Sequence, residues 1–409
     1  MNKPRHAPMD QFPVVDDCLV IGGVALPELA RRVGRTPFYA YDRRLITERV
    51  VLLRKHLPRS VHIHYAIKAN PMPEVVKHLA DLVDGLDVAS AGELKIALGS
   101  GMRPEAISFA GPGKTDAELE QALAAGILIN LESEGEMERL AAIATRSGAR
   151  ARVNVRVNPD FELKSSGMKM GGGPKPFGVD AERVPDMLRR IGELKLDFQG
   201  FHIFSGAQNL RADAIAEAQR KTVELAIRLA EHAPGPVHIL NIGGGFGIPY
   251  FPGDERLDLV VVGRNLAEIL AGLNRRLPRA QVVLELGRFL VGEAGVYVCR
   301  VIDRKLSRGH VFLVTDGGLH HHLAASGNFG QVIRKNYPVT VGNRVRGNER
   351  ETVSVVGPLC TPLDVLAEHM EIAVADRGDL IVTFQSGAYG ASASPTAFLN
   401  HPPPAEVLV

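Results

Sequence analysis

A regular alternation of short strands and helical stretches is the feature that most limits the fold of this chain. Eight segments rich in β-branched residues recur between residues 61 and 291: HIHYAIK (62–68), GLDVAS (85–90), AISFAG (106–111), ILINLES (127–133), RVNVRVN (152–158), QGFHIFSG (199–206), HILNIGGG (238–245) and VVLELGRF (282–289). The stretches between them space apolar residues three to four apart, as amphipathic helices do. Eight such units favour a closed (β/α)₈ barrel, typically ~250 residues long, over the alternative of a doubly wound open sheet.

The end of the chain has a different pattern. Strand-like segments follow one another there without helical stretches between them: VYVCRVIDRKL, HVFLVTDGG, YPVTVGN, ETVSVVGPLC and DLIVTFQSG. This order is typical of an all-β domain, and the opening segment is strand-rich as well. The sequence therefore predicts an α/β barrel over residues 44–290 and a β-rich domain built from residues 1–43 and 291–409.

Composition excludes several classes of protein. A formal net charge of +2 gives no reason to expect nucleic acid or an anionic membrane as a partner. No stretch approaches the ~20 apolar residues that span a bilayer, and the N-terminus lacks the apolar core of a signal peptide. Three widely spaced cysteines indicate neither a disulfide framework nor a metal site, so we expect a cytoplasmic protein without a bound metal.

Two polar residues stand at strand ends, where the catalytic side chains of a barrel collect. Lys68 ends the first strand after an apolar run, which predicts a desolvated amine able to attack a carbonyl. The alternative for Lys68 is an ordinary surface lysine. Asp87 ends the second strand, and by itself it is better explained as a turn or helix-cap residue.

The last two barrel strands carry a glycine run and a carboxylate. Gly243, Gly244 and Gly245 end the seventh strand, where backbone N–H groups free of side chains bind phosphate in many barrels. Glu285 and Arg288 follow on the eighth strand, and a buried carboxylate there needs a cationic partner or a ring nitrogen to protonate. Lysine, phosphate cradle and acid together match the needs of pyridoxal 5'-phosphate (PLP).

These residues lie in seven motifs whose order resembles the fold-type III PLP-dependent decarboxylases, and among them the diaminopimelate type. The motifs are YAIKAN, GLDVASAGEL, GFHIFSGAQ, NIGGGFG, ELGRFLV, GPLCTPLD and SGAYGASASPTAFLNHPPPAEVL. The resemblance implies the alanine racemase-like fold, a barrel with a β domain. It also implies PLP as cofactor, a small amino-acid substrate, and a head-to-tail homodimer with shared active sites.

The resemblance also assigns roles to individual residues. It makes Lys68 the Schiff-base lysine and Glu285 the acid on the pyridine nitrogen, which keeps the ring able to accept the electron pair left by carbon dioxide. Cys360 resembles the cysteine that the partner chain donates to return a proton. The residues implied to contact the cofactor phosphate or a substrate carboxylate are Gly243, Gly244, Gly245, Arg288, Arg334, Tyr337 and Tyr389.

The cofactor end of the pattern departs from the family at two positions. Phe204 in FHIFSGAQ stands where relatives carry a histidine stacked on the cofactor ring. Phe204 has an aromatic face but no polar atom, and His202 shares its side of the strand as a candidate to compensate. Ala207 replaces a serine expected at the phosphate, with Ser205 close by.

The substrate end departs as well. Thr361 occupies the position of an acidic residue that reads a distal ammonium group, and Asp364 is the next acid along the chain. A buried ammonium without a carboxylate is costly, which weakens the case for a free diamino acid. The Gly-rich segment 164–180, interpreted as an active-site loop, resembles a sub-branch with a butirosin decarboxylase acting on a carrier-tethered glutamyl group and with exosortase-associated decarboxylases.

The sequence thus predicts a PLP-dependent amino-acid α-decarboxylase of the diaminopimelate type. A decarboxylase of a carrier-tethered or modified amino acid is the alternative within the same class. A racemase of this fold is disfavoured because racemases resemble one another in placing an arginine, rather than an acid such as Glu285, on the ring nitrogen. A non-catalytic PLP-binding protein and a barrel without PLP are the remaining alternatives.

Overall fold

The computed structural model describes residues 9–161, 168–169, 171–329, 331 and 335–409. The chain forms two compact units, one of residues 1–48, 249–255 and 288–409, the other of residues 49–248 and 256–287. Residues 249–255, which the sequence places within the barrel, group with the β-rich unit. The domain borders at residues 44 and 290 stay a prediction. No helix in the described part of the chain is both long and apolar enough to cross a membrane.

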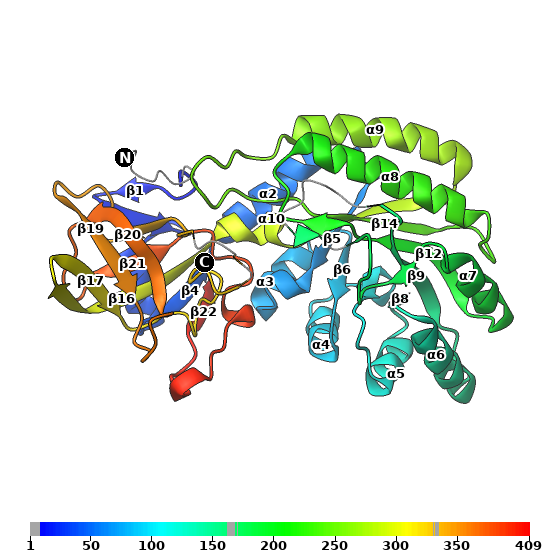
Figure 1. The fold of residues 1–409 in the computed structure, drawn as a ribbon, viewed down its shortest axis with the longest axis horizontal. Coiled ribbons are helices and arrows are strands. Elements are labelled where there is room, and N and C mark those ends of the chain that lie inside the picture. Colours follow the sequence, from blue (N-terminus) through cyan, green and yellow to red (C-terminus); the bar gives the residue numbers. More distant parts are fainter. Residues whose placement is uncertain (1–8, 162–167, 170, 330, 332–334) are drawn as a thin grey trace. The chain divides into compact units, whose positions relative to one another are not determined.

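The second unit is a closed parallel barrel (Figure 1). Its strands are β5 (His62–Ala66), β6 (Gly85–Val88), β7 (Ile107–Phe109), β8 (Leu128–Leu131), β9 (Arg152–Asn158), β12 (Asp197–Ile203), β14 (Ile239–Gly244) and β15 (Gln281–Leu286). Each pairs in parallel with the next, and β15 pairs with β5 to close the ring. The eight strands and the closed barrel predicted from the sequence are confirmed.

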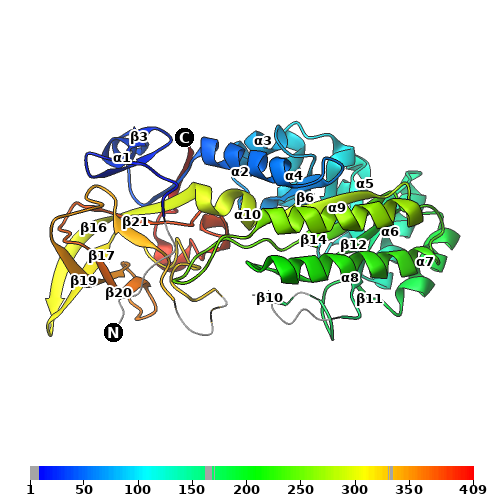
Figure 2. The same ribbon diagram turned by 90° about the horizontal axis from the view of Figure 1, so that it is seen from above.

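Helices alternate with the strands along the chain and cover the outside of the barrel (Figure 2). They are α2 (Arg43–His56), α3 (Pro73–Ala80), α4 (Ala91–Gly99), α5 (Asp116–Ala125), α6 (Glu134–Ser147), α7 (Val184–Glu193), α8 (Ala212–Ala230) and α9 (Leu259–Arg276). Thr115 begins α5 with a capping box to Glu118, and Gly126 ends the same helix in the left-handed conformation. Local capping signals therefore fix where such a helix begins and ends.

The interior of the barrel is unusually polar. Branched apolar side chains fill most barrels of this kind. Here the buried residues on the strands include Asp87, Ser108, Asn130, Asn154, His202, Asn241 and Glu285. Hydrogen bonds run from strand to strand: Ser108 donates to Asp87 at 2.5 Å, and Asn130 donates to Ser108 at 3.2 Å. A barrel interior of this kind can hold charged groups that an apolar core would exclude.

The first unit is built on an antiparallel-rich sheet of eight strands. They are β4 (Phe38–Tyr41), β16 (Gly295–Ser307), β17 (His310–Thr315), β18 (Val339–Val341), β19 (Arg350–Val356), β20 (Val365–Ala373), β21 (Leu380–Thr383) and β22 (Ala405–Leu408). The small strands β1 (Val14–Val15), β2 (Cys18–Ile21) and β3 (Val24–Ala25) precede α1 (Leu26–Val33), and α10 (Arg288–Val291) leads into β16. Strand β4 pairs with β16, and residues 1–48 group with the β-rich unit.

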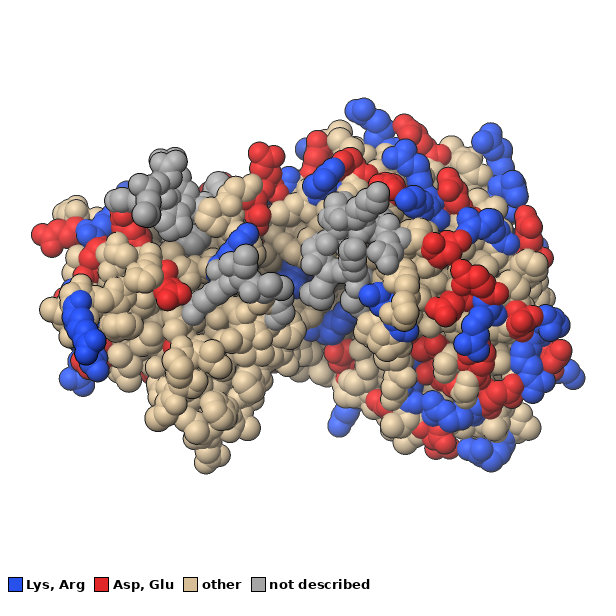
Figure 3. All heavy atoms as spheres, in the orientation of Figure 1, with Lys and Arg blue, Asp and Glu red and all other residues tan. Residues whose placement is uncertain are grey.

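Charged side chains of both signs are interspersed over the barrel helices on the face in Figure 3. Several form exposed ion pairs, for example Arg190 with Glu138 and Lys221 with Glu217. Exposed pairs of this kind contribute about 0–1 kcal/mol each. The stability of the barrel therefore depends mainly on its apolar layer between strands and helices.

Candidate active site

Lys68 lies just beyond the carboxyl end of β5, in a 3₁₀ turn of residues Ile67–Ala69. Its Nζ is 3.6 Å from Oε1 of Glu285, which comes from β15. The sequence predicts a desolvated lysine, but 47% of the Lys68 side chain is exposed. The turn carries the lysine past the apolar strand that precedes it, so the neighbouring carboxylate, rather than burial, sets its environment.

Glu285 has a basic side chain at each carboxylate oxygen. Lys68 lies at Oε1, and Nε2 of His202 on β12 lies 3.0 Å from Oε2. Burial acts to raise the pKa of Glu285, but the charge of Lys68 and the contact with His202 outweigh it and hold the pKa well below its usual value. Glu285 is therefore a buried carboxylate rather than a neutral acid.

Phe204 follows β12 and lies beside both Lys68 and the glycine run. Its ring centroid is 5.8 Å from Nζ of Lys68. A side chain at Gly243 would place its Cβ 2.9 Å from Cδ2 of Phe204, so the ring packs directly on that glycine. The structure thus separates two residues that the sequence treated as alternatives, because His202 contacts Glu285 and Phe204 contacts Gly243.

The glycine run forms a cradle with the segment after β12. Ser205, Gly206, Asn209, Ile242, Gly244 and Gly245 line a small cavity there. A Cβ at Gly244 would collide with the carbonyl oxygen of Glu285, and one at Gly245 with the carbonyl oxygen of Gly206. Gly245 also has φ +69°, a left-handed conformation that favours glycine. Only glycine fits these two positions, and a backbone without side chains is one that an anion can approach closely.

We expect Gly245→Ala to lower the free energy of unfolding by about 1–3 kcal/mol and to weaken cofactor binding. The methyl group meets the carbonyl of Gly206 and forces the backbone out of its left-handed conformation. Gly235→Ala is the matched control, because a Cβ there meets no atom and Gly235 precedes the same strand. Denaturant unfolding and a cofactor titration measure both effects, and equal behaviour of the two variants would contradict the cradle.

Asp87 lies inside the barrel and is engaged with other residues of the interior. Its Oδ1 is 3.1 Å from Nδ1 of His64 and accepts a hydrogen bond from Ser108. Its Oδ2 is buried and accepts no hydrogen bond within the described part of the chain. Burial acts to lower the pKa of His64, but Asp87 outweighs it, so the pKa is raised. A role for Asp87 at the cofactor stays a prediction.

The β-rich unit contains its own cluster of predicted residues around Arg288. The guanidinium of Arg288 lies 4.7 Å from the ring centroid of Tyr389 and 5.4 Å from that of Tyr250, and it donates a 2.6 Å hydrogen bond to the Tyr250 hydroxyl. The Tyr337 ring is 4.7 Å from that of Tyr250. Tyr250 was missed by the sequence reasoning, although it follows the glycine run within GIPY. Arg334 lies outside the described residues.

Two residues near the predicted proton donor have local roles in the structure. Cys360 is an exposed free thiol. The Thr361 hydroxyl accepts a hydrogen bond from the backbone of Leu363. Asp364 is the next acid along the chain after Thr361, which stands where an acidic substrate contact is expected. Its side chain is buried and accepts hydrogen bonds from the backbone N–H groups of Leu319 and Leu359. Its carboxylate is therefore occupied by the β-rich unit and does not replace the lost acid.

The described part of the Gly-rich segment 164–180 lies along the cradle. Strand β10 (Met168–Lys169) pairs with β13 (Gly206–Ala207), directly after Ser205, and β11 (Val179–Asp180) pairs with β9. Glu132 accepts hydrogen bonds from the Gly178 N–H and from Arg156, whose guanidinium lies over the Phe177 ring. The buried Arg156–Glu132 pair was missed, although Glu132 directly follows β8 and Arg156 lies near the end of β9.

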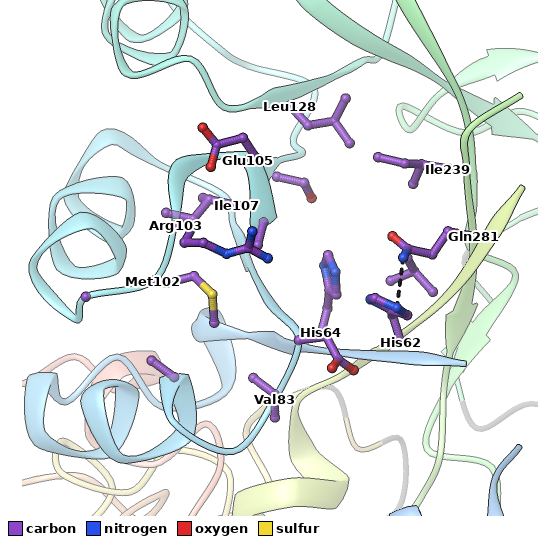
Figure 4. A pocket seen from close by; sticks show the side chains of 16 residues that line it. His62, His64, Val83, Met102, Arg103, Glu105, Ile107, Leu128, Ile239 and Gln281 are labelled. Atoms are coloured by element: carbon purple, nitrogen blue, oxygen red, sulfur yellow. Dashed lines mark hydrogen bonds between the residues drawn. The ribbon is translucent and has the colours of Figure 1, made fainter. Parts of the chain in front are cut away.

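A cavity of the barrel unit lies at the opposite end from Lys68. It measures about 440 Å³ and is lined by His62, His64, Arg103, Ser108 and Gln281 among others (Figure 4). Nε2 of His62 is 2.8 Å from Nε2 of Gln281, and both residues begin their strands. The amino ends of the strands form this cavity, so it is separate from the residues that carry the predicted chemistry.

Comparison with known proteins decides the family. A family model described as the pyridoxal binding domain of pyridoxal-dependent decarboxylases matches residues 43–292. The chain belongs to this family. The activity predicted from the sequence, PLP-dependent amino-acid decarboxylation, is thereby confirmed, with PLP as cofactor.

Relatives of this decarboxylase cover nearly its full length. It is 38% identical to an L-glutamyl-[BtrI acyl-carrier protein] decarboxylase from Niallia circulans, over 91% of this chain and 88% of the relative. It is 35% identical to a diaminopimelate decarboxylase from Aquifex aeolicus, over 96% and 91%. The crystal structure of diaminopimelate decarboxylase from M. jannaschi is similar with a TM-score of 0.88 at 27% identity, over 98% of this chain and 92% of that one.

The residues of the decarboxylase fit its cofactor. Oε2 of Glu285 and both ring nitrogens of His202 are buried without a hydrogen bond in the described chain. Buried polar atoms of this kind need a partner: His202 lies beside Oε2, and the carboxylate can in addition serve a pyridine nitrogen. The side-chain-free cradle at Gly244 and Gly245 suits a phosphate, and Lys68 supplies an amine for an aldehyde.

Proposed function

We propose that this decarboxylase removes the α-carboxylate of an amino acid at the carboxyl end of the barrel, with Lys68 holding the cofactor and Glu285 facing its ring nitrogen. The observation that carries the proposal is the contact of Lys68 and His202 with the two oxygens of a buried Glu285. When bound, PLP supplies the electron sink for the pair released with carbon dioxide. The protein supplies the charges that orient it.

Further residues complete this proposal. Gly244, Gly245 and Ser205 bind the phosphate through backbone N–H groups and a hydroxyl, and Gly243, whose N–H donates to Asn241, gives the phosphate room as a residue without a side chain. Phe204 is an uncharged aromatic plate for the ring. Arg288 and Tyr389 bind the phosphate or a substrate carboxylate. Burial acts to lower the pKa of Arg288, but the surrounding tyrosines raise it, so the arginine keeps its charge for an anion. Arg334, Tyr337, Thr361 and Asp87 remain proposed contacts of substrate and cofactor.

For the substrate, free diaminopimelate and a carrier-tethered glutamyl group are the two candidates. Overall resemblance to diaminopimelate decarboxylases supports the first. The second is favoured by the substitution at Thr361, by the engagement of Asp364 with backbone N–H groups, and by the similarity to the Niallia circulans enzyme. Both candidates require the same residues at the cofactor end.

Incubation with each candidate separates them. The purified protein is given free diaminopimelate, or a glutamyl group on an acyl carrier protein, and released carbon dioxide is measured with Lys68→Ala as the blank. Lysine and carbon dioxide from the free amino acid establish the first candidate. Turnover of the carrier-bound group alone establishes the second. Failure of both, together with exchange of the α-hydrogen of an amino acid, would indicate a racemase instead.

We further propose that two chains assemble head to tail and that the exposed Cys360 serves the Lys68 site of the partner subunit. A shared site explains why the thiol that returns the proton is not buried in its own unit. Cys18, Cys299 and Cys360 are all free thiols, which supports a reducing, cytoplasmic location.

A further inference from the structure

His202 occupies a place that its position in the sequence does not reveal. Only 2% of its side chain is exposed, and its Nε2 lies 3.0 Å from Oε2 of Glu285. The other carboxylate oxygen faces Lys68 at 3.6 Å. His202 is therefore a buried imidazole directed at the acid of the site.

The state of Glu285 depends on both basic neighbours. Once Lys68 is committed to the cofactor aldehyde, it no longer offers a free ammonium group to Oε1. Among the described residues, His202 is then the basic side chain that remains in direct contact with the carboxylate, while the charge of Arg156 acts on it from farther away. Phe204 has no polar atom to contribute. A buried carboxylate that loses its donors takes up a proton, since burial disfavours the charged form.

Whether the proton between Glu285 and a pyridine nitrogen sits on oxygen or on nitrogen depends on their relative proton affinities. A donor at the second carboxylate oxygen lowers the affinity of the acid and leaves the proton on nitrogen. We propose that His202 is a positioning residue that donates its Nε2–H to Oε2 of Glu285, keeping the acid ionised and the proton at the ring nitrogen of the cofactor. This inference rests on the proposed function of Lys68 and Glu285.

Three variants of His202 test the role. His202→Leu removes the donor at similar volume, His202→Asn keeps a polar group too short to reach Oε2, and His202→Gln places an amide N–H where Nε2 was. Each is reconstituted with PLP labelled with ¹⁵N in the ring, and the ¹⁵N chemical shift reports whether that nitrogen carries a proton. His62→Leu is the matched control, because His62 lies at the amino ends of the barrel strands and contacts Gln281 (Figure 4).

We expect a protonated nitrogen in the unaltered protein, in His202→Gln and in His62→Leu, and a neutral nitrogen in His202→Leu and His202→Asn. The kcat of the last two falls about 10- to 100-fold, the cost of one hydrogen bond to a charged group. A protonated nitrogen in His202→Leu overturns the inference even if activity falls. If that variant does not fold, the ¹⁵N chemical shift measured with His202→Asn decides whether the inference holds.

Failure of the inference is distinct from failure of the proposed function. If the unaltered protein holds PLP through a group other than Lys68, or releases no carbon dioxide from any amino acid, the proposed function itself is wrong. An active protein whose ring nitrogen is neutral, or whose nitrogen stays protonated without His202, removes only the role of His202.

Discussion

Lys68→Ala is expected to abolish the absorption band that a covalently held cofactor gives near the visible edge, and to lower decarboxylation by on the order of 10³-fold or more. Lys68 is the amine placed at the carboxyl end of β5 against the carboxylate of Glu285. Alanine keeps the 3₁₀ turn but offers no group to hold the aldehyde. Absorbance after reconstitution with PLP and carbon dioxide release measure the two effects.

Lys77→Ala is the matched control for this prediction. Lys77 is exposed on α3, the helix that follows the same strand, and it carries the same charge. Its replacement should leave the band and the rate unchanged. A band that persists in Lys68→Ala would show that another amine holds the cofactor, and the assignment of the whole site to the end of β5 would then be wrong.

The sequence predicted the barrel and the proximity of Lys68 and Glu285 because both depend on local patterns. Strand-helix alternation predicts the eight strands, and strand ends place Lys68, Glu285 and the glycines on one edge. Glycine is also the only residue that fits at position 245, so the residue type alone reveals the close backbone contact there.

The pairing of His202 with Glu285 was not predictable, because it depends on register across three strands. His202 pairs with Asn241 on β14, while Glu285 pairs with Gly244, and a register shift separates these two positions of β14. Gly243 and Gly244 carry no side chain, so atoms of Phe204, Glu285 and Leu286 occupy the space beside β14. A pattern on one strand contains no information about such a shift.

The surroundings of Lys68 and Asp364 show a different limit of prediction from sequence. An apolar run before Lys68 predicts burial, but the chain turns at Ile67 and leaves the amine half exposed. Asp364 is the nearest acid in sequence to Thr361, but its carboxylate binds backbone N–H groups of its own unit. Sequence distance indicates which residues are candidates, whereas the paths of neighbouring loops decide which candidates are free to act.

Cys360→Ala is expected to lower decarboxylation by about 10²- to 10⁴-fold, because it removes the group proposed to return a proton after carbon dioxide leaves. The cofactor band should remain, since Lys68 is intact. Cys18→Ala is the control, because its thiol is not fully buried and lies in the strand-rich opening segment. A Cys360→Ala protein with full activity would remove the thiol from the reaction.

Mixing the two inactive variants tests whether the sites are shared between chains. If Cys360 serves the Lys68 site of the partner subunit, a mixed dimer of Lys68→Ala and Cys360→Ala contains one site with both groups intact and one with neither. Random exchange makes half of the dimers mixed, so about a quarter of the unaltered activity returns. Mixing Cys360→Ala with the double variant should return none, because no site then combines both groups. If both groups belonged to one chain, neither mixture would recover activity, and the proposed head-to-tail sharing would be wrong.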